Sequence, residues 1–224
     1  RTIEYAVLET ARGGLVNRGL GYEIADVGVV TNVTEDHLGI DGINTLEDLA
    51  FVKSLGVEAV KDDGYSVLNA DDPYCLGMRE RIKSQVILFS MNTDNEAVTE
   101  HVNNGGTALY ADGNNILVNK GGEVFTLIDI RKIPATMEGA LMHNVSNSMA
   151  AAAAALGIGI PAEIIRKGLM SFKCDSETNP GRFNIYEVNG AKVILDYGHN
   201  IDGYRVVIDS LQRMRTGRLI GVIG

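Results

Sequence analysis

Hydrophobic and polar residues alternate in blocks between residues 1 and 90 of the chain. Short apolar runs predict strands over residues 5–9, 26–33, 65–69 and 86–90. Thr45 and Asp48 have the spacing of a helix-capping pair, and the apolar stripe that follows predicts a helix from Leu46. Strands that alternate with helices favour a parallel sheet covered on both faces. The expected fold class is therefore α/β.

The pattern changes between residues 92 and 135. Three short β-like runs, over residues 108–111, 116–118 and 124–128, are separated by two turns rich in Gly and Asn. These residue types supply the positive φ angles that tight hairpin turns need. We therefore expect a small antiparallel sheet appended to the parallel one.

Helical patterns dominate the next stretch of the chain. An unbroken alanine run over residues 150–155 predicts a helix that packs closely on its neighbour, and a second helix is expected over residues 162–172. Beyond them, an apolar run at 193–195, a helical pattern at 204–214 and an apolar run at 219–223 predict the start of another α/β domain. The expected domains are residues 1–182 and 183–224.

Composition narrows the classes of function. Of the 224 residues, 45% are hydrophobic and 22% are charged, as in ordinary globular proteins. The net charge of −9 argues against a nucleic-acid partner, and no apolar run is long enough for a transmembrane helix. Cys75 and Cys174 show no pairing pattern, which favours a reducing cytoplasm. The chain starts at Arg1 without methionine and stops within an apolar run, so we expect a fragment of a longer protein.

The stretch over residues 29–39 is the first candidate site. Its apolar, β-branched start predicts a buried strand, and Asn32, Asp36 and His37 follow at the carboxyl end of that strand. Ligands bind outside the carboxyl ends of the strands in open α/β sheets. The alternative is a strand that runs into an ordinary polar loop.

Glu9 and Lys53 are the next candidates. Glu9 ends an apolar run and precedes Gly13 and Gly14, a pair that is weak evidence for a phosphate-binding loop; the alternative is a structural acid that caps a strand. Lys53 falls on the apolar stripe of the helix expected from Leu46. A lysine there usually extends to water, but a semi-buried lysine with a lowered pKa has a free amine that reacts with carbon dioxide.

The second half of the chain carries candidate nucleotide contacts. Asn144 and Asn147 are three residues apart and share one helix face, where carboxamides either pair with an adenine edge or cap the helix. Arg182 follows a Pro-Gly turn; its planar guanidinium suits phosphate, although such an arginine is normally a solvated surface group. Asp196 and His199 follow an apolar strand, as the polar residues do in the stretch over 29–39.

These elements together resemble the Mur ligase family of ATP-dependent amide-forming enzymes. The matching sequences are T-N-x-x-x-D-H-L-G from Thr31, N-A-D-D-P from Asn69, H-N-x-x-N-x-x-A-A from His143, P-G-R-F from Pro180 and D-Y-G-H-N from Asp196. The sequence E-T-A-R-G-G from Glu9 is similar to that in the Mur-ligase-like half of cyanophycin synthetases. Gly198 and Ile201 replace the family's usual alanine and proline, which loosens the geometry expected there.

The resemblance implies a role for each candidate residue. It assigns magnesium binding to Glu9, His37 and a carbamylated Lys53. It also gives His37 and Lys53 catalytic roles. It assigns the nucleotide to four residues: Asn144 and Asn147 for adenine, Arg182 for the phosphates and Asp196 for the ribose side. Asn32 and His199 are expected to line the catalytic site.

The implied reaction is amide formation driven by ATP. A carboxylate attacks the γ-phosphate, an acyl phosphate forms, and an amine displaces phosphate, with catalysis mostly by positioning and charge neutralisation. In cyanophycin synthetases this half is expected to add arginine to aspartate side-chain carboxylates. The expected partners are ATP and an amino-acid or peptide substrate, with Mg²⁺ as cofactor and no nucleic acid or membrane. A homo-oligomer is left open.

The family's phosphate-binding P-loop lies upstream of the element at Glu9, and this chain contains no such loop. We therefore expect that the chain alone does not catalyse ligation. Two alternatives stay open. One is a Mur-like nucleotide-binding or assembly module without chemistry. The other is an unrelated metal-dependent hydrolase that uses Glu9, Asp36 and His37, for which the sequence offers too few further ligands.

Overall fold

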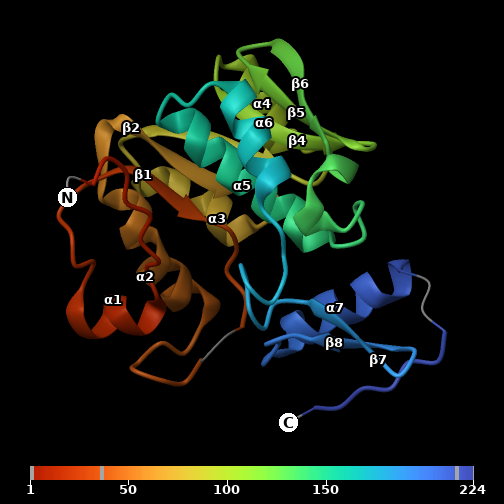
Figure 1. The fold of residues 1–224 in the computed structure, drawn as a ribbon. Helices are drawn as coiled ribbons and strands as arrows, with labels where there is room; N and C mark the ends of the chain where they lie inside the picture. The colour runs from red at the N-terminus through yellow and green to blue at the C-terminus, as the bar shows by residue number, and fades with distance from the viewer. Residues whose placement is uncertain (1–2, 36–37, 215–216, 224) are drawn as a thin grey trace.

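The computed structural model describes residues 3–35, 38–214 and 217–223. Within them, six strands form one sheet in the order of the chain (Figure 1). These strands are β1 (Ala25–Val30), β2 (Val60–Asn69), β3 (Gln85–Ser90), β4 (Thr107–Asp112), β5 (Asn115–Lys120) and β6 (Glu123–Asp129). The pairs from β1 to β4 are parallel and those from β4 to β6 are antiparallel. The expected α/β fold class is confirmed.

Helices cover both faces of this sheet, as predicted. One face packs against α2 (Leu46–Glu58), α3 (Pro73–Gly77) and α4 (Glu96–Asn103), and the other against α5 (Met142–Gly157) and α6 (Ala162–Ser171). Successive strand residues point to opposite faces, so Val67 joins the core under α5 while Leu68 joins the core under α2. The inner parallel strands β2 and β3 are therefore buried on both sides over their apolar runs. The burial expected of the strand before Thr31 is only partly right, because β1 is the edge strand of the sheet and Val29 is 42% exposed.

Helix α2 begins at the predicted residue because its capping pair forms in full. The Thr45 hydroxyl accepts a hydrogen bond from Asp48 N at 3.1 Å, and Asp48 Oδ2 accepts one from Thr45 N at 3.1 Å. Both bonds satisfy amide groups that the first helical turn leaves without intrahelical partners. The start of the helix that carries Lys53 is thus fixed by local sequence.

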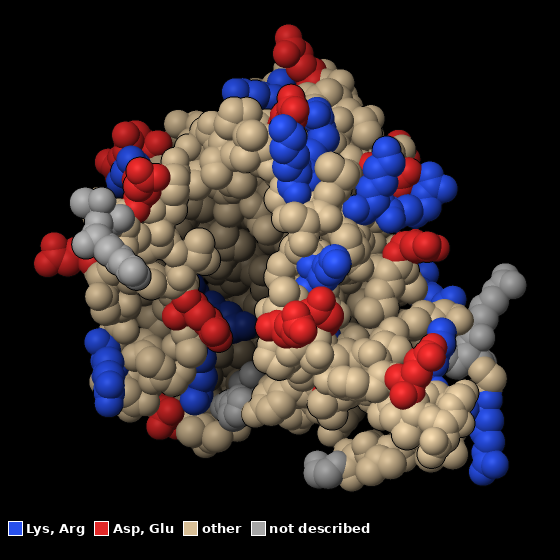
Figure 2. All heavy atoms as spheres, viewed as in Figure 1, with Lys and Arg blue, Asp and Glu red and all other residues tan. Residues whose placement is uncertain are grey.

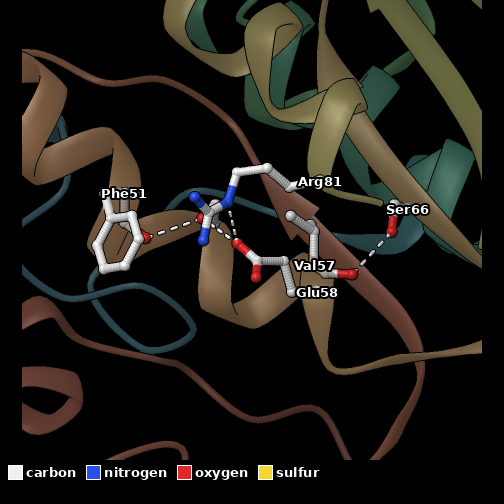
Figure 3. A network of polar contacts seen from close by, with 6 residues as sticks. Phe51, Val57, Glu58, Ser66 and Arg81 are labelled. Carbon is white, nitrogen blue, oxygen red and sulfur yellow. Dashed lines mark hydrogen bonds and ion pairs between the residues drawn. The ribbon is translucent and has the colours of Figure 1, made fainter. Parts of the chain in front are cut away.

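The last turn of α2 is tied to the short helix η1 (Met78–Arg81) by a polar network (Figure 3). The Glu58 carboxylate accepts hydrogen bonds from Arg81 Nε and from Ser54 Oγ, both at 2.5 Å. The Arg81 guanidinium also lies over the Phe51 ring, 4.5 Å from its centroid. One arginine therefore joins two side chains of α2 to the segment between β2 and β3.

The close packing expected of the alanine-rich helix is confirmed. Ala150, Ala152 and Ala153 of α5 are buried against the sheet. At the end of the helix, a Cβ on Gly157 would lie only 2.9 Å from Cβ of Tyr65 on β2. Small residues on this face let α5 cross the parallel strands with little space between the two backbones.

The three antiparallel runs predicted between residues 92 and 135 are confirmed as β4, β5 and β6. They continue the parallel sheet, because β4 pairs with β3 from Ile87↔Thr107 to Ser90↔Tyr110. The stretch also contains α4, which the sequence reading did not predict; Asn95 caps this helix by accepting a hydrogen bond from Val98 N at 3.1 Å.

Two predicted strands are wrong. Residues 5–9 carry no strand, and Val7 is 100% exposed. Residues 219–223 also carry none, and Val222 is 93% exposed. Neither segment pairs with a described strand. An apolar, β-branched run becomes a strand only where a neighbouring strand takes up its backbone hydrogen bonds, so sequence pattern alone misled in both places.

The chain after residue 182 forms a hairpin and a helix. The hairpin consists of β7 (Asn184–Val188) and β8 (Ala191–Leu195), and α7 (Ile201–Arg213) follows it. The helix predicted over 204–214 is confirmed, and it begins earlier because Asn200 accepts a hydrogen bond from Gly203 N at 2.8 Å. The domain division after residue 182 stays a prediction.

A small apolar cluster joins this part of the chain to the start of α5. Leu141, Phe183 and Leu211 are its buried members, and Met137 packs against them. The cluster holds the β7–β8 hairpin beside the first turn of α5, which places two of the predicted nucleotide-binding elements next to each other. None of the helices in the described part of the chain combines the length and hydropathy needed to span a bilayer.

Candidate functional site

The parallel strands β1, β2 and β3 end at the same edge of the sheet. Val30 pairs with Leu68, and Asn69 pairs with Phe89, so the segments that follow these strands emerge together. Figure 2, viewed from the same side as Figure 1, shows a deep hollow in the surface beside the end of β1. Basic side chains lie inside its lower part and acidic side chains stand at its margins. This edge is the candidate site.

Three side chains from three different elements hold the backbone of residues 31–33, directly after β1. The hydrogen bonds are Asn69 Nδ2 to Thr31 O at 2.8 Å, Lys53 Nζ to Asn32 O at 2.9 Å and Val33 N to Asp72 Oδ2 at 2.6 Å. Each residue of the segment thus has one backbone group fixed by a side chain. The loop that leads to Asp36 and His37 leaves the sheet in a defined direction.

Lys53 and Asn32, both predicted catalytic residues, are brought together by this arrangement. Lys53 is half-buried on α2, and its amine reaches the Asn32 carbonyl oxygen across the end of β1. The lysine therefore turns inward to the strand end. This geometry fits the functional interpretation of Lys53 better than an amine directed only to water.

The predicted magnesium ligands are only partly described. Glu9 is exposed in the segment before α1 (Arg12–Arg18), whereas His37 lies outside the described residues. Within residues 3–35, 38–214 and 217–223, no group of three or more His, Cys, Asp or Glu side chains is placed to hold a metal ion. Gly13 and Gly14, considered for a phosphate loop, lie inside α1.

Asn144 and Asn147 share one face of the first turns of α5, as predicted. Asn144 Nδ2 donates to Ala135 O at 2.7 Å, and Asn147 Nδ2 donates to Asn144 Oδ1 at 3.3 Å. Asn144 is half-buried and anchored, whereas Asn147 is exposed. Neither side chain caps the helix, because neither hydrogen bond involves a backbone N–H group of α5.

His143 connects this helix start with the end of β8. Its Nδ1 atom is buried, with no hydrogen-bond partner among the described residues. Burial lowers the pKa of His143, and the negative charge of Asp196 acts in the opposite direction. A pKa below the ordinary value of 6.5 favours the neutral imidazole at pH 7.

Asp196 fixes the turn that follows β8. Its Oδ2 accepts a hydrogen bond from Phe183 N at 2.9 Å, and its Oδ1 accepts one from Gly198 N at 2.7 Å. Phe183 has a left-handed φ of 50°, so the chain bends sharply where Arg182 enters the hairpin. Asp196 thereby links the P-G-R-F element to the D-Y-G-H-N element.

Arg182, Tyr197 and His199 form an exposed row beside Asp196. The Arg182 guanidinium lies over the Tyr197 ring at 5.2 Å from its centroid, and the Tyr197 and His199 rings are 5.5 Å apart. His199 Nδ1 is 3.2 Å from Tyr197 O. The structure therefore brings Arg182, Asp196 and His199 together.

Sequence reasoning did not single out Asn69, Asp72, Tyr197 or the Ala135 carbonyl. The first two lie in N-A-D-D-P, which was noted only as a family match after a strand. Their position at a carboxyl strand end was the available signal. The Ala135 carbonyl carried no signal, because a backbone acceptor is the same in every sequence.

Comparisons with known proteins show which families and relatives the chain is similar to. The Mur ligase middle domain matches residues 1–155, and the Mur ligase, glutamate ligase domain matches residues 181–224. The chain is 40% identical over 223 residues to the cyanophycin synthetases of Synechocystis sp. and Crocosphaera subtropica. All of the chain aligns, against 25% and 26% of those proteins. It thus spans about a quarter of their length.

The chain is also similar to a more distant relative and to solved structures. UDP-N-acetylmuramate--L-alanine ligase of Brucella anthropi is 30% identical over 203 residues, which are 89% of this chain and 40% of that ligase. A crystal structure of MurF from Acinetobacter baumannii has a TM-score of 0.61 at 20% identity, over 84% of this chain and 37% of that one. The crystal structure of a murein peptide ligase from Psychrobacter arcticus has a TM-score of 0.54 at 17% identity. The match covers 87% of this chain and 36% of that one.

Proposed function

Because the chain belongs to the Mur ligase family, we propose that it is part of an ATP-dependent ligase that forms an amide bond. The proposed substrates are those of cyanophycin synthetases: an amino acid, arginine, is joined to aspartate side-chain carboxylates. The observation that carries this proposal is the 40% identity to cyanophycin synthetases along the whole chain. We propose that the ligase needs the rest of the longer protein.

The proposed reaction has two steps. A carboxylate oxygen of the acceptor attacks the γ-phosphorus of ATP, the bond to the bridging oxygen breaks, and ADP leaves. The amine nitrogen then attacks the acyl carbon, the acyl carbon–oxygen bond breaks, phosphate leaves, and the nitrogen loses a proton. Such chemistry depends mainly on positioning and on electrostatic stabilisation, which are the tasks of the protein side chains.

The second half of the candidate site suits the nucleotide. Asn147 presents an exposed carboxamide, held by Asn144, and the proposed role of this pair is adenine binding. Arg182 is an exposed guanidinium beside the carboxylate of Asp196, and we assign the two to the phosphates and to the ribose side.

The first half suits the reacting groups. Asn32 and Lys53 lie at the end of β1, and His199 is assigned to the same reaction site from the other half. A carbamylated Lys53 keeps one N–H on its nitrogen, so the hydrogen bond to Asn32 O is compatible with that modification. The carbamylation of Lys53 is itself a proposal, and it rests on the family resemblance.

Mg²⁺ is proposed as the cofactor, and it would neutralise charge on the transferred phosphoryl group. The described residues alone do not fit a complete magnesium site, because their carboxylates and imidazoles form no ligand cluster. Glu9, His37 and Lys53 stay the proposed ligands, and no step is assigned to the ion.

We also propose a cytoplasmic location, since Cys75 and Cys174 are free thiols. A homo-oligomer is left open.

Binding of a non-hydrolysable ATP analogue tests the proposal. Calorimetry is run with and without Mg²⁺ on this chain and on a version extended upstream through a P-loop, together with Asn147→Ala and Arg182→Ala variants. Binding by the extended protein, weakened in both variants, supports the ligase, and amide formation with arginine and an aspartate peptide then identifies the reaction. If the extended protein binds no nucleotide, the non-catalytic assembly module replaces the ligase proposal.

A further inference from the structure

We propose that Asp72 is a positioning residue, which holds the loop after β1 in the orientation that the reaction needs. This inference rests on the proposed ligase function. Asp72 is half-buried, lies three residues after the end of β2 and caps α3. Its hydrogen bonds run to Val33, Tyr74 and Cys75, none of which belongs to the proposed nucleotide site. Its effect on the reaction therefore passes through the backbone of the neighbouring loop.

The two carboxylate oxygens of Asp72 have separate tasks. Oδ1 accepts hydrogen bonds from Tyr74 N at 2.9 Å and Cys75 N at 3.0 Å, and so caps α3. Oδ2 accepts a hydrogen bond from Val33 N at 2.6 Å, across to the segment that follows β1. A charged acceptor makes this bond short and strong. One side chain therefore couples the start of α3 to the loop at residues 31–35.

The Val33 bond has no equivalent among the other loop contacts. Asn69 and Lys53 donate to the carbonyl oxygens of Thr31 and Asn32, whereas Val33 offers an N–H and needs an acceptor. The Val33 side chain is also buried, with 5% of its surface exposed. Val33 is thus fixed on both sides, and residues 34 and 35 continue from this fixed point toward His37.

Asp71 provides a matched control beside Asp72. Its carboxylate also accepts three hydrogen bonds, from Ser90 Oγ at 2.6 Å, Met91 N at 2.5 Å and Asn95 Nδ2 at 3.1 Å. These bonds fix the turn between β3 and α4, where no candidate catalytic residue lies. The two neighbouring aspartates are chemically alike and differ in the loop that each one holds.

The test compares Asp72→Asn with Asp71→Asn in the full-length protein. In Asp72→Asn the remaining oxygen keeps the cap of α3, because two N–H groups face it, and the new amino group faces Val33 N. Hydrogen–deuterium exchange of residues 31–35 reports the loop, and steady-state kinetics of ATP-dependent amide formation reports kcat and the KM for ATP. Asp72→Ser, which also keeps a capping oxygen but is too short for Val33, replaces the variant if Asp72→Asn does not fold.

We expect Asp72→Asn to speed exchange over residues 31–35 and to lower kcat by roughly 10- to 100-fold, with an unchanged KM for ATP, because a small displacement of a reacting group has effects of this size. Asp71→Asn should speed exchange near residues 90–95 and leave kcat unchanged. An unchanged kcat in Asp72→Asn overturns the inference while the ligase stands. An unsubstituted protein that forms no amide overturns the proposed function and, with it, any role of Asp72 in ligation.

Discussion

Gly28 on β1 lies directly against the backbone carbonyl of Gly56 on α2. A Cβ built on Gly28 would be 2.6 Å from Gly56 O and 2.8 Å from Cγ2 of Val60. The missing side chain therefore lets α2 approach the strand more closely than any other residue would permit. The same approach brings Lys53, three residues before Gly56, within hydrogen-bonding distance of Asn32 O.

Gly28→Ala should destabilise the chain by about 1–3 kcal/mol, because α2 must move away from β1 or the strand must shift. The free energy of unfolding from urea denaturation measures this effect. Gly168→Ala is the matched control: Gly168 lies inside α6, and a Cβ there meets nothing within 4 Å. We expect the control to stabilise the chain by about 0.5–1 kcal/mol, through its better helix propensity. Equal effects of the two substitutions would contradict the contact at Gly28.

The Glu58–Arg81 pair should make stability depend on pH in the acid range. Partial burial raises the pKa of Glu58, but the hydrogen bonds from Arg81 and Ser54 outweigh it, and the pKa lies below its ordinary value of 4.5. A carboxylate with a lowered pKa stabilises the folded state above the ordinary value, and this contribution is lost as pH falls through the folded-state pKa. Unfolding free energies measured from pH 7 down to about pH 3 should show the loss.

Glu58→Gln should remove that part of the pH dependence and cost up to about 1 kcal/mol at pH 7, because the pair is partly exposed. The control is Glu163→Gln, whose ion pair with Lys167 spans 3.2 Å on the exposed surface of α6. Little change in unfolding free energy is expected there at pH 7. A Glu58→Gln variant with the same acid-side slope as the unsubstituted chain would show that the network does not titrate as described.

The two asparagines on α5 should differ in their effect on stability, although both contribute to nucleotide binding. Asn144→Ala leaves the buried carbonyl of Ala135 without its 2.7 Å donor, so we expect a loss of about 1–3 kcal/mol in unfolding free energy together with weaker ATP-analogue binding. Asn147→Ala should weaken binding with a stability change within about 0.5 kcal/mol, since its side chain is exposed. Urea denaturation and calorimetry of both variants measure the two effects. Equal stability losses would contradict the assigned anchoring role of Asn144.

Much of the fold was predictable because its signals are local. Thr45 and Asp48 marked the start of α2, the alanine run marked α5, and alternating strands and helices marked the parallel sheet. Residues 5–9 and 219–223 show the limit of such signals, since a strand also needs a partner strand. Pattern alone does not say whether one is present.

The sequence predicted which residues belong to the candidate site better than it predicted the hydrogen bonds that join them. The matched elements contained Asn144, Arg182 and Asp196, the helix predicted from Leu46 contained Lys53, and the structure places these residues near strand ends and the first turn of α5. The links between elements were not predictable, because they join backbone atoms to distant side chains. Asp72 to Val33 crosses 39 residues of sequence, and no spacing rule indicates such a contact.

Asp196 should set the protonation of His143 across the junction between β8 and α5. Burial lowers the pKa of His143, and the charge of Asp196 partly offsets this. Asp196→Asn removes the charge, so the pKa of His143 should fall further. His143 then stabilises the folded state above its ordinary pKa of 6.5, and this contribution disappears as pH falls through the lower folded-state value.

NMR titration of the imidazole resonances measures the pKa directly, and His101 is an internal control in the same spectra. Burial also lowers the pKa of His101, but this residue bonds to Val86 O on the far side of the sheet from α5, and Asp196 does not act on it. We expect the pKa of His101 to stay constant while that of His143 falls in Asp196→Asn. A constant or higher pKa for His143 would mean that Asp196 exerts no field at the start of α5, and its proposed place beside the nucleotide would lose its electrostatic support.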